Sequence, residues 1–272
     1  MNELAKYLTE ISCDGLVSGL CQQQAAVRFD LTFAEVESAM LGLGLWPARY
    51  QRNRRTISTE GQLALLHSSV TVIGCGGLGG YIIEGLARLG VGRIIAVDPD
   101  VFEEHNLNRQ VLSTMANLGL PKVTAAARRV SDINPAVSLV PVETAFSSGN
   151  AVELLEQATV AIDALDNLTA RRQLAHACRE LGIPLVHGAI AGWYGQVATQ
   201  RRGEDISPHF MGQGDEPKGV ELKLGNPAFT PAAVASLQLA EACKVILGQG
   251  ETISGRMLVF NLLEMEFEAV CL

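Results

Sequence analysis

The 272-residue sequence contains no Cys-x-x-Cys pair, although it has six cysteines. They lie far apart in the chain: Cys13, Cys21, Cys75, Cys178, Cys243 and Cys271. Cysteine zinc sites and disulfide frameworks show paired or regularly spaced cysteines, so we expect neither zinc nor disulfide bonds. Widely spaced free cysteines are typical of a reducing compartment, and we expect a cytoplasmic protein.

The chain also lacks a basic excess, a long apolar run and an amino-terminal signal. Its net charge of −8 argues against a general nucleic-acid surface. No uninterrupted apolar run reaches eighteen residues, and the first six residues show no basic-then-apolar pattern. We therefore expect a partner that is neither nucleic acid nor membrane. One local basic cluster stands out, formed by Arg49, Arg52, Arg54 and Arg55.

What the chain does have is a regular alternation of apolar β runs and helical segments. The apolar fraction is 48%, enough for a sizeable core. Strands are predicted at 70–75, 93–97, 137–142, 160–163 and 185–190, with helices at 79–90, 121–133, 149–157 and 167–181 between them. This pattern predicts an α/β, Rossmann-like fold with a mostly parallel sheet and helices on both faces.

The two ends of the chain depart from this alternation. Residues 1–48 are predicted to form a small helical appendage, in which Thr32 and Glu35 form a capping box that opens a helix to about residue 41. Residues 49–272 form the main domain. After a strand at 194–200, residues 201–230 look like a long loop over a site. A helix at 231–247 and two antiparallel strands, 257–261 and 265–270, complete the chain.

A glycine-rich turn follows the first strand of the main domain. Its glycines fit Gly-x-Gly-x-x-Gly, and an acid stands nineteen residues beyond the last of them. The residues concerned are Gly74, Gly76, Gly77, Leu78, Gly79 and Asp98. Such glycines let the backbone approach phosphate at a helix start, and the acid suits ribose hydroxyls. No Gly-x-x-x-x-Gly-Lys-Ser/Thr motif occurs, and the turn alone does not separate a hydride-transfer enzyme from an ATP user.

A second set of polar residues narrows this choice. Asn106 and Arg109 are three residues apart, so they lie on one face of a short helical turn and offer donors to phosphate oxygens. Lys122 opens the next helix, where its charge opposes the macrodipole unless an anion lies between them. Asp100 either holds ribose hydroxyls or orients these basic groups, or it simply forms a turn.

The fourth strand ends in Asp163-Ala-Leu-Asp166-Asn167 at the carboxyl edge of the sheet, where ligands bind in such folds. Asp166 is a candidate ligand for Mg²⁺, which prefers oxygen ligands and bridges phosphates. The alternative is that Asp166 or Asn167 caps the following helix. Both interpretations can hold for this pair.

Together these motifs resemble the ThiF/MoeB/HesA family of adenylyltransferases, relatives of the ubiquitin-activating enzymes. The resemblance runs from about Arg49 to Val270, and its parts occur in the family's order. They are Arg49–Asn53, Gly74–Gly79, the phosphate motif Asn106–Gln110, Lys122, Asp166-Asn167, Gly188–Val197 and 235–242.

The resemblance implies a function and roles for these residues. Asp98 would bind the ATP ribose, while Asn106, Arg109, Gln110 and Lys122 would hold the triphosphate. Asp166 would hold Mg²⁺, and Arg52 would reach the phosphates of the opposite subunit in a homodimer. The partner would be a small ubiquitin-fold sulfur carrier ending in Gly-Gly. Its C-terminal carboxylate would attack the α-phosphate to give an acyl-adenylate and pyrophosphate.

The chain also departs from the family in two places. Many relatives carry two Cys-x-x-Cys pairs around a structural zinc, and the corresponding regions, near 203–214 and after 250, have none here. Relatives that capture the carrier covalently use a cysteine in the loop corresponding to 201–230, which here contains none. The resemblance therefore favours adenylation without zinc and without a covalent carrier–enzyme step.

Three other functions remain open at this point. A tRNA threonylcarbamoyladenosine dehydratase belongs to the same superfamily and needs no carrier, but the acidic charge and the form of Asn106–Gln110 argue against it. An NAD-dependent oxidoreductase is compatible with the glycine turn. An inactive, partner-binding relative would not need the full set of ATP-contacting residues. The sequence names neither the carrier nor its pathway.

Overall fold

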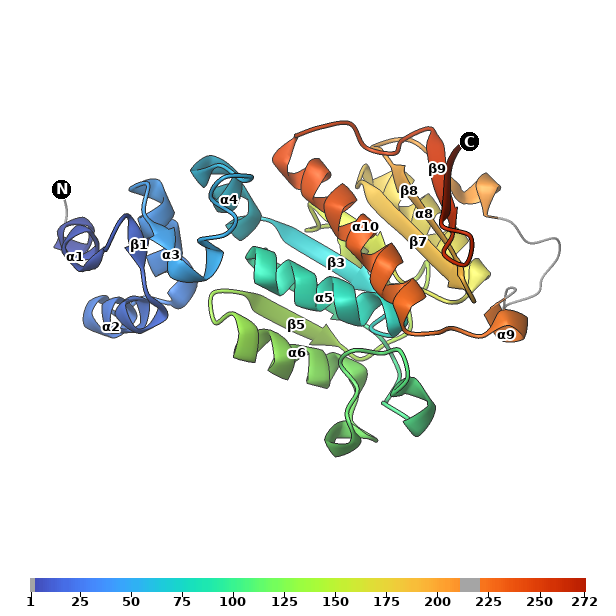
Figure 1. Cartoon of the computed structure of the whole chain (residues 1–272), viewed down its shortest axis with the longest axis horizontal. Coiled ribbons are helices and arrows are strands. Elements are labelled where there is room, and N and C mark those ends of the chain that lie inside the picture. Colours follow the sequence, from blue (N-terminus) through green and yellow to red (C-terminus); the bar gives the residue numbers. More distant parts are fainter. Residues whose placement is uncertain (1–2, 211–220) are drawn as a thin grey trace.

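The computed structural model describes residues 3–210 and 221–272. Its centre is an eight-stranded sheet in the order β10-β9-β8-β7-β6-β3-β4-β5 (Figure 1). The five parallel strands are β3 Ser69–Ile73, β4 Arg93–Val97, β5 Ser138–Val142, β6 Val160–Asp163 and β7 Leu185–Ala191. The three antiparallel strands are β8 Tyr194–Gln200, β9 Arg256–Asn261 and β10 Glu266–Cys271. The predicted fold class and the antiparallel closing strands are confirmed.

Helices cover both faces of this sheet. The side chains packed on one face come mainly from α4 Thr59–Leu66, α5 Gly77–Leu89, α6 Lys122–Ile133 and α10 Phe229–Leu247. The other face is covered by α7 Ala151–Leu155 and α8 Leu168–Leu181. The central strands are apolar on both sides: Val70 and Val72 face the first helix layer, whereas Ile73 faces the second. This two-sided burial explains why the strands read as continuous apolar runs.

Helix α10 is the one helix in the described ranges that is long and apolar enough to cross a membrane, judged by length and composition alone. In the fold it packs along α5, β7 and β8. It also carries polar residues, Gln238 and Glu241, that are buried against the sheet. The apolar composition of α10 is therefore explained by its position as a core helix.

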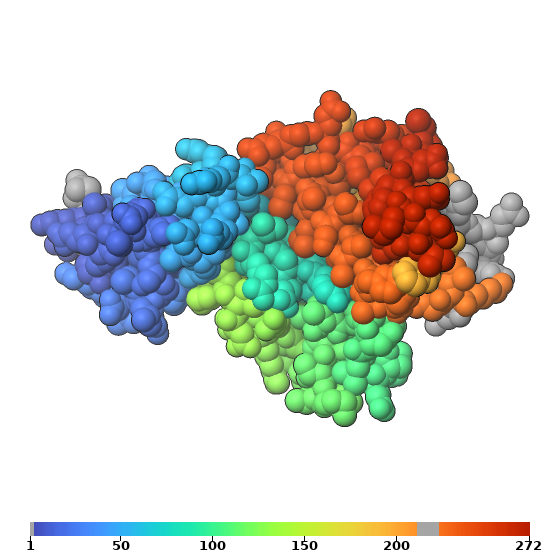
Figure 2. All heavy atoms as spheres, viewed as in Figure 1, coloured from blue at the N-terminus to red at the C-terminus, as the bar shows by residue number. Residues whose placement is uncertain are grey.

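Residues 3–48 form a lobe at one end of the molecule (Figures 1 and 2). It contains α1 Glu3–Ile11, β1 Leu16–Val17, α2 Gly19–Phe29, α3 Phe33–Gly42 and β2 Trp46–Pro47. Its helices enclose their own apolar cluster, which includes Leu8, Val17 and Met40. The capping box is confirmed, since the backbone N–H of Thr32 donates to Glu35 Oε2 at 2.7 Å.

Arg49 fastens this lobe to the main domain. Its guanidinium forms an ion pair with the fully buried Glu37 and donates to Gln22 Oε1 at 2.8 Å. Burial raises the pKa of Glu37, and the neighbouring Arg49 opposes that rise. The next residue, Tyr50, is also buried, and its hydroxyl accepts from Asn134 Nδ2 at 2.6 Å. Arg49 is thus occupied by the lobe and is not a free member of the basic cluster.

The segment 201–230 differs most from the sequence expectation. It contains a 3₁₀ turn at Ser207–His209 and a short helix, α9 Glu221–Leu224, and α10 begins at Phe229, before Pro231. Proline tolerates the first turn of a helix because its missing N–H would be unpaired there. Likewise α5 begins at Gly77, before the expected Gly79, because the glycine turn passes directly into the helix. Part of the expected loop, 211–220, lies outside the described residues.

Candidate functional site

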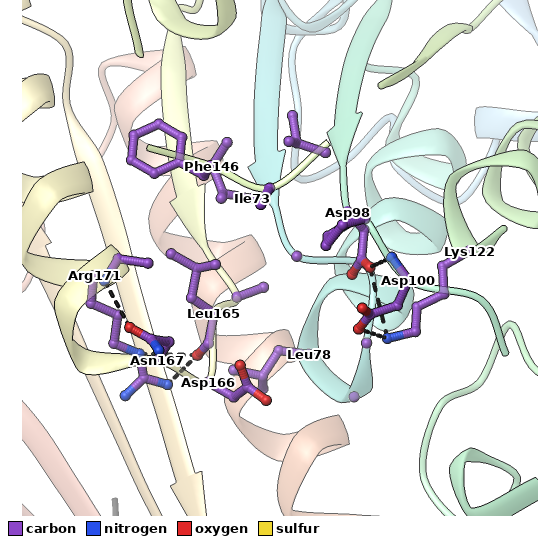
Figure 3. A pocket seen from close by; sticks show the side chains of 18 of the residues that line it. Ile73, Leu78, Asp98, Asp100, Lys122, Phe146, Leu165, Asp166, Asn167 and Arg171 are labelled. Atoms are coloured by element: carbon purple, nitrogen blue, oxygen red, sulfur yellow. Dashed lines mark hydrogen bonds and ion pairs between the residues drawn. The ribbon is translucent and has the colours of Figure 1, made fainter. Parts of the chain in front are cut away.

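A cavity of about 930 Å³ opens at the carboxyl edge of β3, β4 and β6. Most of the sequence-predicted residues line it: Gly74, Gly76, Gly77, Leu78, Asp98, Asp100, Arg109, Gln110, Lys122, Asp166 and Asn167. Figure 3 shows the charged groups on two opposite walls, with Asp98, Asp100 and Lys122 on one and Asp166, Asn167 and Arg171 on the other. Of the predicted residues, Gly79, Asn106 and Arg52 are not part of the lining.

The glycine turn forms the floor between these walls. Gly74 has φ +98°, and a Cβ there would lie 2.6 Å from the carbonyl oxygen of Ala164. Gly79 serves packing, because its Cβ would lie 1.8 Å from the carbonyl oxygen of Gly74. Gly76 and Gly77 line the cavity, and the amino end of the 13-residue α5 starts there. Exposed backbone N–H groups at a helix start form an anion site.

The β4 wall combines two carboxylates with one ammonium group. Asp98 Oδ2 accepts from the Cys75 N–H at 2.7 Å, and Asp98 Oδ1 accepts from the Asp100 N–H at 2.9 Å. Lys122 Nζ lies 2.9 Å from Asp100 Oδ2 and 3.7 Å from Asp98 Oδ1. Burial raises the pKa of the Asp98 carboxyl, while the Lys122 charge and the two N–H donors oppose the rise. Asp100 therefore orients the lysine, one of the three alternatives given for it above.

In the segment 106–110, only some of the residues are placed as predicted. Asn106 is buried, and its Oδ1 accepts from the Glu103 N–H at 2.9 Å, so this side chain shapes the turn instead of facing the cavity. Arg109 lines the cavity and is steadied by Nη1 bonds of 3.0 Å to the His105 carbonyl and 2.9 Å to Asn108 Oδ1. Gln110 is buried, and its Oε1 has no hydrogen-bond partner in the described structure. Arg109 and Gln110 remain the members of this motif available to a ligand.

On the β6 wall, Asp166 is exposed to the cavity. Asn167 Oδ1 accepts from the Ala170 N–H at 3.0 Å and thereby caps α8, one of the two alternatives for this pair. Behind them, the fully buried Asp163 accepts from His187 Nδ1 at 2.7 Å. Neither His187 nor Arg171 is predicted from the sequence. The Arg171 Nε donates to the Leu165 carbonyl at 2.9 Å.

An apolar part of the cavity was also missed. It is lined by Ile73, Val97, Phe146 and Leu165. Phe146 follows β5, whose carboxyl end lies at the same sheet edge as those of β3, β4 and β6. The segment after residue 142 could therefore have been found by examining every parallel strand end. These side chains offer a surface on which a flat heteroaromatic ring can lie.

The ThiF family matches residues 50–272. This chain belongs to the ThiF family. It is 39% identical over 226 residues to the SAMP-activating enzyme E1 of Haloferax volcanii, covering 82% of this chain and 84% of that protein. It is 38% identical over 221 residues to a sulfur carrier protein adenylyltransferase of Thermus thermophilus, covering 78% and 81%. The resemblance to this family and the assignment to the adenylyltransferases are confirmed.

Solved structures share the fold of this ThiF-family chain. Escherichia coli MccB with ATP matches with a TM-score of 0.70 at 19% identity, covering 83% of this chain and 73% of that one. The E. coli tRNA N6-threonylcarbamoyladenosine dehydratase TcdA matches with a TM-score of 0.64 at 22% identity, covering 75% and 95%. At these identities the likeness shows the architecture alone.

Arg52 of this ThiF-family chain lies away from its own cavity. It is exposed in the turn at 51–56. The preceding Tyr50 hydroxyl lies against Gly90, at the carboxyl end of α5, whereas the cavity lies at the amino end of that helix. A helix of this length spans about 20 Å. The chain's own Arg52 is therefore not placed to reach a ligand in this cavity.

The residues present fit ATP with a divalent cation. Gly76, Gly77, Arg109 and Lys122 supply donors and positive charge for phosphates, and the apolar side chains suit a base. Among the described residues no three His, Cys, Asp or Glu side chains cluster as a metal site. A cation held by Asp166 therefore needs phosphate and water oxygens as its other ligands, which is how Mg²⁺ is usually bound beside nucleotides.

Proposed function

We propose that this ThiF-family chain uses Mg·ATP to adenylate the C-terminal glycine carboxylate of a small ubiquitin-like sulfur-carrier protein, releasing pyrophosphate. The observation that carries the proposal is the position of Lys122 and Asp166 on opposite walls of a cavity that Arg109 also lines. A cavity built for a dinucleotide needs no second carboxylate opposite a lysine, whereas a triphosphate with its cation uses both. The names of the two relatives support the choice of a carrier protein.

Each wall has its own part in this reaction. Asp98 accepts hydrogen bonds from ribose hydroxyls, and the N–H groups of Gly76 and Gly77 face the phosphates. Lys122 and Arg109 neutralise the charge that develops on the α-phosphate and on the departing pyrophosphate. Asp166 holds Mg²⁺, which adds positive charge next to the phosphates when it is bound. No general base is required, because the attacking carboxylate is already ionised at neutral pH.

An exposed apolar surface beside the cavity supports a protein substrate. The turn between β7 and β8 and the turn between β9 and β10 lie at the cavity edge of the sheet, together with the start of α10. Trp193 packs against Phe229 with ring centroids 4.4 Å apart, although both rings are about 40% exposed. Leu263 and Met265 are also exposed, in the turn between β9 and β10. A patch of this kind suits a folded partner better than a small carboxylate.

We also propose that the enzyme is a homodimer in which Arg52 completes the neighbour's cavity. Two observations support this: Arg52 is exposed at a distance from its own cavity, and the turn that carries it is held by the buried Tyr50. An arginine from a second subunit would add positive charge at the phosphates, where Arg109 and Lys122 already lie. Closed dimers make the two sites equivalent.

No covalent capture of the carrier through 201–230 is part of the proposal, because that segment has no cysteine. Three of the other cysteines are poorly suited to the role. Burial raises the pKa of Cys178 to about 12 and that of Cys243 to about 11, and it also raises the pKa of Cys75. A thiol that is protonated at neutral pH is a poor nucleophile.

We propose further that no zinc is needed where many relatives carry cysteine pairs. Buried Glu241 accepts from Thr199 Oγ1 at 2.6 Å and from the Ile253 N–H at 2.7 Å, and it pairs with Lys244 at 2.6 Å. Nearby, Ser254 Oγ donates to Glu204 Oε2 at 2.9 Å. The Ser254–Glu204 bond joins the segments 201–205 and 249–255 directly, and Glu241 of α10 links Ile253 to Thr199 at the end of β8. Elemental analysis of protein purified without added metal is expected to find no stoichiometric zinc.

The second candidate is adenylation of a small carboxylate on tRNA, since TcdA shares the fold. The net charge of −8 and the apolar patch beside the cavity favour the carrier protein. An NAD-dependent oxidoreductase is the least favoured, because Lys122, Arg109 and Asp166 have no part in hydride transfer.

The test is exchange of labelled pyrophosphate into ATP. The expected result is exchange that requires a ubiquitin-fold protein ending in Gly-Gly and is lost when the last glycine is removed. The same exchange assay is run in parallel with tRNA in place of the carrier protein. Carrier-independent exchange stimulated by tRNA would transfer the proposal to the dehydratase. Calorimetry that detects NAD binding but no ATP binding would overturn both.

A further inference from the structure

We infer that Arg171 and the buried Asp163–His187 pair are positioning residues for Asp166, so that they set the affinity for the cation without touching it. The inference rests on the proposed function, because it assumes that Asp166 holds a divalent cation beside ATP. A set of hydrogen bonds fixes the backbone on both sides of Asp166.

The backbone before Asp166 is held at both of its polar groups. Asp163 Oδ1 accepts from the Leu165 N–H at 3.0 Å. The Leu165 carbonyl accepts two bonds from Arg171, one from Nε at 2.9 Å and one from Nη2. The Arg171 Nε also lies 3.8 Å from Asp163 Oδ2, so one guanidinium spans the carbonyl and the carboxylate. The peptide groups on either side of Leu165 therefore have little freedom to rotate.

The backbone after Asp166 is fixed by the cap of α8. Asn167 accepts the Ala170 N–H through its side chain, as described above, and starts a helix of fourteen residues. Asp166 is thus a single residue between two anchored segments. Its own carboxylate is exposed, and within residues 3–210 and 221–272 no hydrogen bond or ion pair competes for it. Figure 3 shows Arg171 bonded to this loop while the Asp166 carboxylate points into the open cavity.

Asp163 is in turn oriented from behind. His187 donates through Nδ1 to Asp163 Oδ2, and its Nε2 lies 3.2 Å from Gln196 Nε2, which makes Gln196 the donor to a neutral imidazole. The His187 ring packs on Phe210 with centroids 4.4 Å apart. Gln238 donates to the Asp163 carbonyl at 2.8 Å. His187 on β7, which is itself held by Gln196 on β8 and by Phe210, therefore restrains the Asp163 carboxylate, and helix α10 restrains the Asp163 backbone.

The charges in this network explain why arginine is needed. Asp163 is fully buried, and the neutral His187 supplies a hydrogen bond without a compensating charge. Arg171, whose side chain is 12% exposed, is the nearest cation to Asp163 among the described residues. It also offers donors in a fixed fork, which a lysine does not. Groups that orient a metal ligand in this way typically change metal affinity 10- to 100-fold when they are removed.

The experiment compares wild type with Arg171→Gln, Arg171→Lys and the control Arg179→Gln. Arg179 lies on the same helix α8 but pairs with surface acids, Glu180 and Asp205. Mn²⁺ is titrated into protein with a non-hydrolysable ATP analogue, and free Mn²⁺ is followed by electron paramagnetic resonance. Calorimetry measures binding of the same analogue in excess EDTA, and thermal melting checks the fold.

For Arg171→Gln we expect about tenfold weaker Mn²⁺ binding in the nucleotide complex and unchanged binding of the metal-free analogue. Arg171→Lys should lie between, and Arg179→Gln should match wild type. Unchanged Mn²⁺ affinity in Arg171→Gln and Arg171→Lys overturns the inference, as does an equal loss for the metal-free analogue, which would mean that Arg171 contacts the nucleotide. If Arg171→Gln does not fold, Arg171→Lys decides alone. Absence of Mn·nucleotide binding by the wild type would instead refute the proposed function.

Discussion

The two walls of the cavity use similar charged residues in different ways. On the β4 wall, Asp98, Asp100 and Lys122 all line the cavity and bond to one another there. On the β6 wall, Asp163 pairs with His187 behind the surface and with Arg171, which lines the cavity and bonds to the Leu165 carbonyl. Asp166 alone among the carboxylates of this wall reaches the cavity. One wall binds with its charges, whereas the other uses most of its charges to hold one carboxylate in place.

The largest effect is expected from removing the charge that each wall presents. Lys122→Ala on the β4 wall and Asp166→Ala on the β6 wall should each lower carrier-dependent pyrophosphate exchange about a hundredfold or more, the scale of lost transition-state electrostatics. Thermal melting should remain near wild type for Asp166→Ala, because its side chain is exposed. Activity within a fewfold of wild type in either variant would contradict the roles assigned to the walls.

The next largest effect is expected from Arg52, and it tests whether a second subunit adds charge to the cavity. Arg52→Ala and Asp166→Ala proteins, each nearly inactive alone, are mixed under conditions of subunit exchange. A hybrid dimer has one site with neither defect, so part of the activity should return. Lack of recovery, or a monomeric mass by light scattering, would show that Arg52 does not act in the site. The charged residues of the site would then be those of the two walls alone.

The β4 wall and its neighbouring turn could largely be predicted from sequence, because their residues follow a strand and a helix start in fixed order. Asp98 ends one strand and Lys122 begins the next helix, so each follows from local pattern. The Asp163–His187 pair could not be predicted, because it joins neighbouring strands 24 residues apart and depends on their register. Asn106 shows the converse. Its spacing from Arg109 predicts that both side chains lie on one face, but the Asn106 side chain accepts a hydrogen bond from the Glu103 N–H instead.

A smaller effect is expected when activity and stability are compared between variants of Arg109 and Asn106, the two residues of the phosphate motif. Arg109→Ala removes a charge from the cavity and should reduce exchange strongly with little change in stability. Asn106→Ala removes a capping bond, which typically costs about 1 kcal/mol of stability, and should lower activity less than Arg109→Ala does. Chemical denaturation and exchange assays on both variants measure this. A larger activity loss in Asn106→Ala would show that its amide reaches the ligand.

The smallest effect concerns the buried side of the β6 wall. Burial lowers the pKa of His187 below its ordinary value of 6.5, so the native protein keeps it neutral while the unfolded chain takes up a proton. The contribution of the neutral His187 to the free energy of unfolding is therefore complete above pH 6.5. It is lost as the pH falls below that value, by at most about 1.4 kcal/mol per pH unit. Denaturation of wild type and His187→Asn between pH 7.5 and 5 should show a shallower dependence in the variant. Parallel curves would assign the acid sensitivity to other groups.

The ion pair between Arg49 and Glu37 has a consequence for how the subunits communicate. Arg49 stands three residues before Arg52, and it is bonded to α2 and α3 of the lobe through Gln22 and Glu37. In the proposed dimer, Arg52 of one subunit enters the other subunit's cavity, and the segment that carries it is bonded to the lobe of its own subunit. In that dimer, a partner that binds and tilts the lobe would move a charge in the opposite cavity, so the lobe would link binding on one protomer to the chemistry of its neighbour.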